Sequence, residues 1–409
     1  MNVIRFELKK IFSKPVNKIV FVILAVVLCS VSYLAIRSVE YVDENGDTII
    51  GVEAAQRLRK EKNQWAGYIT EDVLLKVLEE NALINNSEEY LSDDVTENNK
   101  AYSKKQGFYD IREMINRAFG SFQEYNYYRV DSVTKEEICS FYDKRMDNLI
   151  KWLNSDEQKN YYSEQEKQFL IGQYEKLKTP FYYEYDDGWE ALLEYAPSII
   201  MLVVLITGFL VSGIFPDEIQ LKADNIFFST KLGRNKAIIA KIWAGFIVVT
   251  AIYWITILLF SIIVLTILGT DGAFCAIQNG FSSWKSFYNI TYLQDYLLTI
   301  LGGYLGNLFI LFLSMFVSAK TRSKALAATI PFILLFIPSF LSGISVLSKV
   351  LGLLPDQLLQ ICIAIRTFNL YQIGDKVVGA VPILLTMYLF FFFLLLPVIY
   401  WAYRKTEIK

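Results

Sequence analysis

The chain has 409 residues, 54% of them hydrophobic, with a mean hydropathy of +0.32, which excludes a set of ordinary soluble domains and indicates an integral membrane protein. The net charge of −2 hides a partition: residues 38–193 carry 32 acidic and 19 basic side chains, and the remainder carries 10 and 21. The absence of histidine excludes Ser-His-Asp and Cys-His catalysis and imidazole zinc sites, and the acidic insert excludes a surface for nucleic acid.

The first 18 residues predict a cytoplasmic interfacial helix. Residues 2–14 mix apolar and basic side chains, as in a helix that lies in the headgroup plane, and Pro15 breaks it before the first span. Plain basic flanking of a span is the alternative. A signal peptide is disfavoured because no small-residue cleavage site follows the apolar run, so 19–37 is predicted to be the first transmembrane helix.

Residues 38–193 predict a mostly helical domain with repeated helix-start signals. Thr134–Glu137 and Ser155–Gln158 both match the capping-box pattern, and Thr70 opens a further candidate helix. After Thr134, apolar residues recur at helical spacing and predict one buried face. The second half of this domain is rich in tyrosine, which could form a substrate-contacting surface, but packing into a small core is the favoured interpretation.

The stretch 180–189, which ends in Gly-Trp, predicts an anchor that joins this domain to the membrane surface. Within and beside it, Asp186, Asp187 and Glu190 could serve a membrane enzyme, but we expect them to be solvated surface or turn residues. A disulfide between two of Cys139, Cys275 and Cys362 is conceivable, whereas free buried thiols are favoured for the cysteines.

Six segments are long and apolar enough to cross a bilayer: 19–36, 196–215, 242–268, 296–318, 325–345 and 381–402. With the N-terminus inside, the cytoplasmic segments hold 16 lysines and arginines and the short outer segments hold 5, so both termini are expected in the cytoplasm and 38–193 outside. Between the last two spans, residues 346–366 are interrupted by Pro355, and two short re-entrant or interfacial helices fit better than two further spans.

The cores of these six segments contain no Asp, Glu, Lys or Arg. Gradient-driven transporters usually need an ionisable residue or an unwound polar site at mid-membrane, and membrane hydrolases need carboxylate pairs, a metal or an activated nucleophile. The Gly302-Gly303-x-x-Gly306 stretch favours close helix packing instead. We therefore expect no intrinsic catalytic site, no metal and no cofactor on this chain, and a partner that supplies the free energy.

The best candidate for the partner contact is the cytoplasmic loop 216–241. Glu218 is followed by an apolar turn at Ile226, Phe227 and Phe228, then by Ser229 and Thr230, and finally by Arg234 and Lys241. At this spacing the loop resembles the segment between the second and third spans of ATP-binding-cassette (ABC) type-2 transporter permeases. Lys222 and Lys231 stand where that family commonly has Gly and Pro. The interfacial helix, the six spans and the large domain after the first span also resemble bacterial permeases of this class.

The resemblance implies a short coupling helix around 217–230 that enters a groove of a cytoplasmic ABC ATPase. Phe227 and Phe228 would be its apolar anchors, and Asp217, Glu218 and Asp224 would face basic groups of the ATPase. The implied coupling residues are Asp217, Glu218, Asp224, Ile226, Phe227, Phe228, Thr230 and Arg234. An ordinary loop with solvated charges is the alternative, but the Ile-Phe-Phe turn is too apolar for it.

The expected fold is an all-α polytopic membrane protein that consists of 1–18, 19–37, the extracellular domain 38–193 and the spans of 194–409. The resemblance implies the permease subunit of an exporter in the bacterial plasma membrane, paired with a second permease subunit, identical or paralogous. ATP and Mg²⁺ are expected on the partner ATPase, because no phosphate-binding loop occurs here. The substrate would be amphipathic or apolar: a peptide, an antibiotic or a lipid. A membrane sensor or immunity protein that binds a peptide without transport is the alternative.

Overall fold

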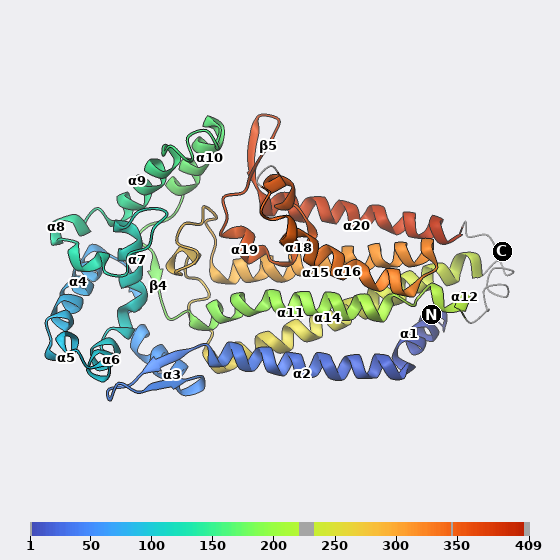
Figure 1. The fold of residues 1–409 in the computed structure, drawn as a ribbon, viewed down its shortest axis with the longest axis horizontal. Coiled ribbons are helices and arrows are strands. Elements are labelled where there is room, and N and C mark those ends of the chain that lie inside the picture. Colours follow the sequence, from blue (N-terminus) through green and yellow to red (C-terminus); the bar gives the residue numbers. More distant parts are fainter. Residues whose placement is uncertain (1, 221–232, 345–346, 405–409) are drawn as a thin grey trace.

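The computed structural model describes residues 2–220, 233–344 and 347–404. Six long helices run side by side along the longest axis of the molecule (Figure 1). The domain between the first two of them, residues 38–186, lies at one end and is called the inserted domain below. The short N-terminal helix and the end of the last helix lie at the opposite end. This is the arrangement that an all-α polytopic chain with one large insert requires.

Six helical segments of the described residues are long and apolar enough to cross a membrane, as predicted. Most of them exceed the predicted apolar cores by several residues, because the helices continue into polar sequence at their ends. Pro15 stands in the first turn of its helix, where a missing N–H costs nothing, and a capping box at Thr291 opens the helix that starts at Tyr292. The segments are Pro15–Arg37 (α2), Asp187–Glu218 (α11, Asp187–Val211, and part of α12, Pro216–Gln220), Asn235–Leu268 (mostly α14, Ile238–Leu268), Tyr292–Thr321 (α15), Lys324–Leu341 (α16) and Ala380–Arg404 (α20).

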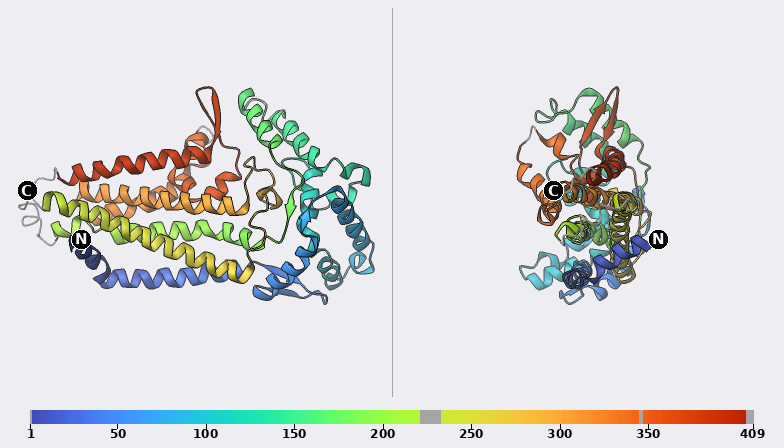
Figure 2. Two further views of the ribbon diagram at one scale, coloured as in Figure 1. Left: turned by 180° about the vertical axis from the view of Figure 1, so that it is seen from behind. Right: turned by 90° about the vertical axis from the view of Figure 1, so that its right-hand side faces the viewer.

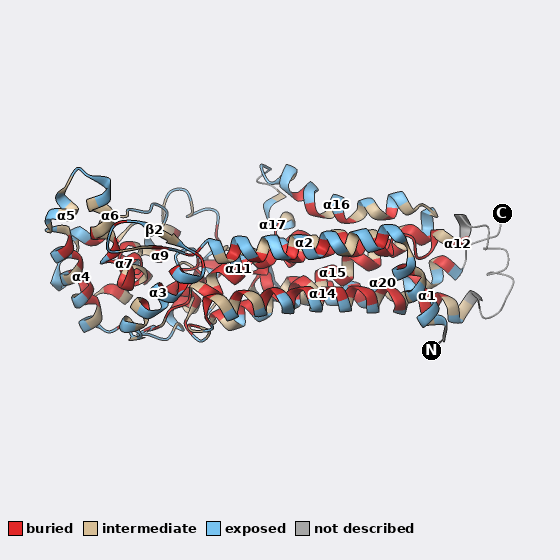
Figure 3. Ribbon diagram, turned by 90° about the horizontal axis from the view of Figure 1, so that it is seen from below, coloured by how far each residue is buried: buried red, intermediate tan, exposed pale blue. Residues whose placement is uncertain are grey.

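Two of these helices form the centre of the bundle. In their most apolar stretches 72% of the residues of the α11 segment and 61% of those of α15 are buried, against 17–22% for α2, α16 and α20 (Figure 3). The predicted close packing at Gly302 and Gly306 is confirmed, since a Cβ at either position would collide with Ile361 or Leu359. The outer helices expose apolar side chains such as Phe336 and Phe390, as expected for surfaces that face lipid.

The inserted domain is mostly helical, with two small antiparallel strand pairs, β1–β2 and β3–β4. The predicted helix starts at Thr70 and Thr134 are confirmed: Thr70 precedes α4, and Thr134 makes a complete capping box. Its elements are β1 (Glu40–Val42), β2 (Thr48–Ile50), α3 (Val52–Lys62), β3 (Gly67–Tyr68), α4 (Glu71–Asn85), α5 (Glu88–Leu91), α6 (Val95–Ser103), α7 (Tyr109–Phe119), α8 (Lys135–Ile138), α9 (Phe141–Leu153), α10 (Glu164–Glu175) and β4 (Tyr182–Tyr183), with 3₁₀ turns at Asn63–Trp65, Gln106–Phe108 and Arg129–Ser132.

One expectation for this domain was wrong, and the expectation of free buried thiols is confirmed only in part. Ser155 opens no helix, because residues 155–162 form successive turns and the second complete capping box is made by Ser163 and Glu166 at α10. Of the four free cysteines only Cys275 and Cys362 are buried, whereas Cys29 and Cys139 are exposed. The tyrosines divide: Tyr174 and Tyr183 are buried as expected for a core, but others remain at the surface.

Segments from the second half of the chain complete the inserted domain. Trp284 and Phe287, from the connection between α14 and α15, belong to its two apolar cores, and so does Leu370. The buried guanidinium of Arg145 donates hydrogen bonds to the carbonyl oxygens of Trp284 and Ser286. The inserted domain is therefore built onto the connections between later helices.

The segment between α16 and α20 contains short helices, as expected, and also a hairpin that was not predicted. The helices are α17 (Ser348–Leu351), α18 (Pro355–Leu359) and α19 (Ile361–Ile365), and Pro355 opens α18. The hairpin consists of β5 (Leu370–Ile373) and β6 (Lys376–Gly379), turned at Gly374, whose positive φ of 61° suits glycine. Ile361 and Leu359 pack against the glycines of α15.

Candidate functional site

Most of the predicted coupling residues lie outside the described residues. They are Asp224, Ile226, Phe227, Phe228 and Thr230, and their roles remain predictions. Arg234 lies in the π-helical turn Gly233–Ala237 that precedes α14. Asp217 and Glu218 lie in α12, which continues from the end of α11. Both described ends of the 216–241 loop therefore lie at the end of the bundle that is remote from the inserted domain (Figure 1).

A buried lysine joins three elements at this end of the bundle. Lys241, in the first turn of α14, is wholly buried. Its Nζ lies 2.7 Å from Oε2 of Glu218 in α12 and 3.0 Å from Oε2 of Glu7 in the N-terminal helix α1 (Asn2–Ser13). It also donates to the carbonyl oxygen of Ile214 at 3.0 Å. Lys241 thus holds both ends of the loop and α1 together.

Lys10 of α1 and Lys14, which lies between α1 and α2, extend this contact. Lys10 Nζ lies 2.8 Å from Oε1 of Glu218, and Lys14 forms an ion pair with Asp217. Burial lowers the pKa of Lys10, but the hydrogen bond and charge of Glu218 outweigh it, so the pKa is raised above its ordinary value. We call these contacts the inner ion-pair network, whose members are Glu7, Lys10, Lys14, Asp217, Glu218 and Lys241.

The spacing of α1 explains how one short helix supplies so many contacts. Glu7 lies three and four residues before Lys10 and Ile11, so these residues share one face of α1, which is turned toward α12 and α14, and Lys14 directly follows the helix. On its other side Phe6 is 65% exposed among basic residues, as in an interfacial helix. Asp217 and Glu218 both contact lysines of this chain, and their contact with basic groups of a partner stays a prediction.

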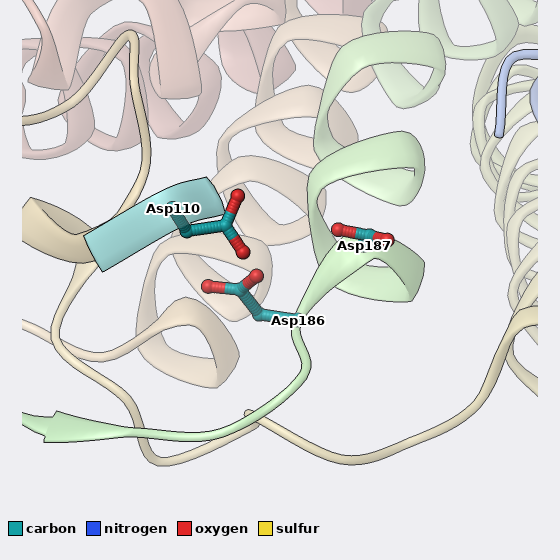
Figure 4. A group of neighbouring side chains, drawn as sticks. All are labelled: Asp110, Asp186 and Asp187. Atoms are coloured by element: carbon teal, nitrogen blue, oxygen red, sulfur yellow. The ribbon is translucent and has the colours of Figure 1, made fainter. Parts of the chain in front are cut away.

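A second polar site lies at the opposite end of the bundle, where the inserted domain meets α11. The carboxylates of Asp110, Asp186 and Asp187 approach one another, with oxygens within 4.8 Å (Figure 4). Asp110 is in α7 of the inserted domain, Asp186 is the residue before α11, and Asp187 begins it. Three carboxylate oxygens at this spacing could hold a metal ion. We call Asp110, Asp186, Asp187 and Glu190 the carboxylate cluster.

Lys62, the last residue of α3, is the cation of this site. Its Nζ lies 2.8 Å from Oδ2 of Asp110 and 2.5 Å from Oδ1 of Asp187. Burial lowers the pKa of Lys62, but the charges of these two carboxylates prevail and raise it well above its ordinary value of 10.5. Lys62 therefore remains charged at neutral pH, and it ties the inserted domain to the start of α11.

Asp186 has the least favourable surroundings in the cluster. Its side chain is 4% exposed, and burial, followed by the charges of Glu190 and Asp110, raises its pKa well above the ordinary value of 3.8. Neighbouring hydroxyls donate to two of the other carboxylates: Tyr183 donates to Asp110 at 2.8 Å, and Tyr292, which also lies close to Asp186, donates to Glu190 at 3.1 Å. The prediction that Asp186, Asp187 and Glu190 are solvated was wrong for Asp186, which is buried, and the other two are half-buried.

A cavity of about 320 Å³ adjoins the carboxylate cluster, between the end of α2, α3, α7 and the first turns of α11. Its charged lining is mainly acidic: Glu40, Lys62, Asp110, Asp187, Glu190 and Glu194. Such a surface attracts cations. The sequence analysis missed this site because Asp110 lies 76 positions before Asp186, and the only local signal was the Asp-Asp pair immediately before a predicted span.

Comparison of the chain with models of protein families, with curated proteins and with solved structures finds no match.

Proposed function

We propose that this chain is the membrane-spanning permease subunit of an ATP-driven exporter. ATP is hydrolysed by a separate cytoplasmic ABC ATPase, and a second permease subunit, identical or paralogous, completes the transporter. The observation that carries the proposal is the inner ion-pair network. It connects the loop expected to contact the ATPase with α1 and with the first turn of α14.

This network could transmit a movement of the ATPase to the helices of the bundle. Force on the 216–241 loop acts on α12 and on the turn before α14, which Glu218 and Lys241 join. Separating these two would leave charges buried and unpaired, which typically costs several kcal/mol, so the elements should move together as a rigid body. From Lys241, α14 runs obliquely across the bundle to the end that bears the inserted domain (Figure 2). Movement caused by closure of the ATPase would thereby be transmitted through α14 to the end of the bundle that bears the inserted domain.

The lysine and arginine asymmetry supports an orientation with α1 and the 216–241 loop in the cytoplasm and the inserted domain outside. The resemblance to bacterial permeases suggests that the membrane is the bacterial plasma membrane. We propose an amphipathic or apolar substrate, such as a peptide, an antibiotic or a lipid. The apolar helices are rich in aromatic side chains and would provide an apolar pathway for such a molecule.

The test replaces the two proposed anchors of the coupling helix. Phe227→Asp/Phe228→Asp should abolish co-purification with the ATPase while membrane insertion is retained, because two charges cannot enter an apolar groove. A matched control is Phe274→Asp, since Phe274 is 76% exposed in the connection after α14, at the other end of the molecule. This control should co-purify normally. Normal co-purification of the double variant would refute the coupling helix.

A further inference from the structure

The carboxylate cluster has an imbalance of charge that no described residue corrects. Four carboxylates, those of Asp110, Asp186, Asp187 and Glu190, surround the single ammonium group of Lys62. Lys62 is already shared between Asp110 and Asp187. Within the described part of the chain, no lysine or arginine forms an ion pair with Asp186. Several negative charges in a buried site require protonation or a further cation.

The side chain of Asp186 is oriented in a way that favours a cation. Asp186 is the N-cap residue of α11, a position where aspartate normally accepts a hydrogen bond from the first turn, but its side chain makes no such bond. The carboxylate points toward Asp110 instead (Figure 4). The hydroxyl of its neighbour Tyr185 is buried and has no hydrogen-bond partner among the described residues. The side chain of Asp186 therefore makes no capping hydrogen bond to α11 and lies among the carboxylates of the cluster instead.

The donor atoms identify the class of cation. All are carboxylate oxygens, which hard divalent cations prefer, and the oxygens of Asp110, Asp186 and Asp187 lie within 4.8 Å of one another. Ca²⁺ accepts several carboxylates in flexible geometry, whereas Mg²⁺ is rarely held by protein side chains alone. The adjoining acidic cavity gives a cation a route from solvent.

We propose that Asp110, Asp186 and Asp187 bind a divalent cation of the Ca²⁺ type, which fastens the inserted domain to the start of α11. The ligands come from both sides of this junction, because Asp110 is in α7 and the other two are at α11. The bound cation would balance much of the negative charge and complement the two ion pairs that Lys62 makes with Asp110 and Asp187. The site would stiffen the junction through which the apolar helices and the inserted domain act on each other.

The test measures binding of Ca²⁺ to the full-length protein, purified in detergent and freed of metal with a chelator. Calorimetric titration should show saturable binding of one Ca²⁺ per chain, and Ca²⁺ should raise the melting temperature. Asp186→Asn keeps the shape of the side chain and should weaken binding about tenfold or more, because the site loses one charged ligand. A matched control is Glu97→Gln, which lies with Glu88 and Glu89 in another acidic patch of the inserted domain and should leave binding unchanged.

Two results would overturn the proposal. One is the absence of saturable Ca²⁺ binding by the wild-type protein up to about 10 mM, beyond the range of weak extracellular sites. In that case the cluster holds its proton on Asp186, and Asp186→Asn should be at least as stable as the wild type. The other is wild-type affinity in both Asp186→Asn and Asp110→Asn. If either variant fails to fold, the Ca²⁺-dependent melting temperature of the wild type decides alone.

Discussion

Lys241 is the residue on which the inner ion-pair network depends. Replacing it with methionine removes the only described cation that Glu7 pairs with and one of the two that pair with Glu218. We expect Lys241→Met to lower the free energy of unfolding by about 3–5 kcal/mol, the usual cost of breaking a buried ion pair. Thermal unfolding of the purified protein in detergent measures the loss.

Lys236, five residues earlier and exposed, provides the control. Lys236→Met should change stability by less than about 0.5 kcal/mol. The triple variant Lys241→Met/Glu7→Gln/Glu218→Gln should recover part of the loss, because no uncompensated charge remains at its centre. If Lys241→Met is as stable as the wild type, the network does not hold these elements together.

A second buried lysine is expected to make the stability of the protein depend on pH. Lys105 is 3% exposed and lies over the ring of Tyr90, and burial, with the nearby charge of Arg112, lowers its pKa from 10.5 to about 8. Between these two values the unfolded chain binds more protons than the folded chain, so this lysine makes stability rise with pH from about 8 to 10.5. Below pH 8 the free-energy cost of burying the charged side chain of Lys105 is fully present.

Lys105→Met should abolish this contribution, which is at most about 3 kcal/mol for a shift of this size. Denaturant unfolding of both proteins at several pH values gives the difference. The variant should gain most, relative to the wild type, at neutral pH, and the gain should shrink as pH rises past 8. A constant difference across this range would show that Lys105 is charged alike in the folded and unfolded chains.

At the scale of elements, the contact between α15 and the α18–α19 segment depends on glycine. A Cβ at Gly302 would lie 2.1 Å from Cδ1 of Ile361 and 3.1 Å from the carbonyl oxygen of Leu358. Gly302→Ala should therefore destabilise the protein by about 1–3 kcal/mol through overpacking. Gly172, in α10, has open space at its Cβ, so Gly172→Ala should stabilise by about 0.5–1 kcal/mol through helix propensity. Equal effects in thermal unfolding would contradict this packing.

The long helices could be predicted because each is specified by its own sequence. Runs of apolar residues predict the six candidate spans, and Pro15 and the Thr134 capping box mark helix starts through local chemistry. The β5–β6 hairpin was missed because its strands are only four residues long and follow directly on the mainly apolar, interrupted stretch 346–366. The packing of Trp284 into the inserted domain was missed because it depends on residues far apart in sequence.

The two polar sites were missed for the same reason. The basic residues of α1 predict an interfacial helix, but only the fold shows that Lys10 and Lys14 turn toward Glu218 and Asp217. Similarly, the acidic pair at the start of α11 does not by itself indicate a site, because the third carboxylate, that of Asp110, comes from α7. Charge patterns predict which side of a membrane a segment occupies, whereas the pairing of charges is set by tertiary structure.

At the scale of the whole molecule, the proposed orientation can be tested through Cys139, a free exposed thiol of the inserted domain. A membrane-impermeant maleimide should label it in intact cells, because the inserted domain would lie outside, and Cys139→Ser should abolish the signal. In that background, Lys236→Cys at the opposite end should be labelled only after permeabilisation. The reverse pattern would invert the proposed topology.

The most direct test of the exporter proposal is affinity purification of this protein from native membranes in mild detergent, followed by mass spectrometry of the proteins that accompany it. We predict stoichiometric recovery of a soluble ATPase that carries a phosphate-binding loop, and any second membrane chain would distinguish a heterodimer from a homodimer. Recovery of the protein alone, or with a histidine kinase in place of the ATPase, would contradict the exporter proposal and favour a sensor.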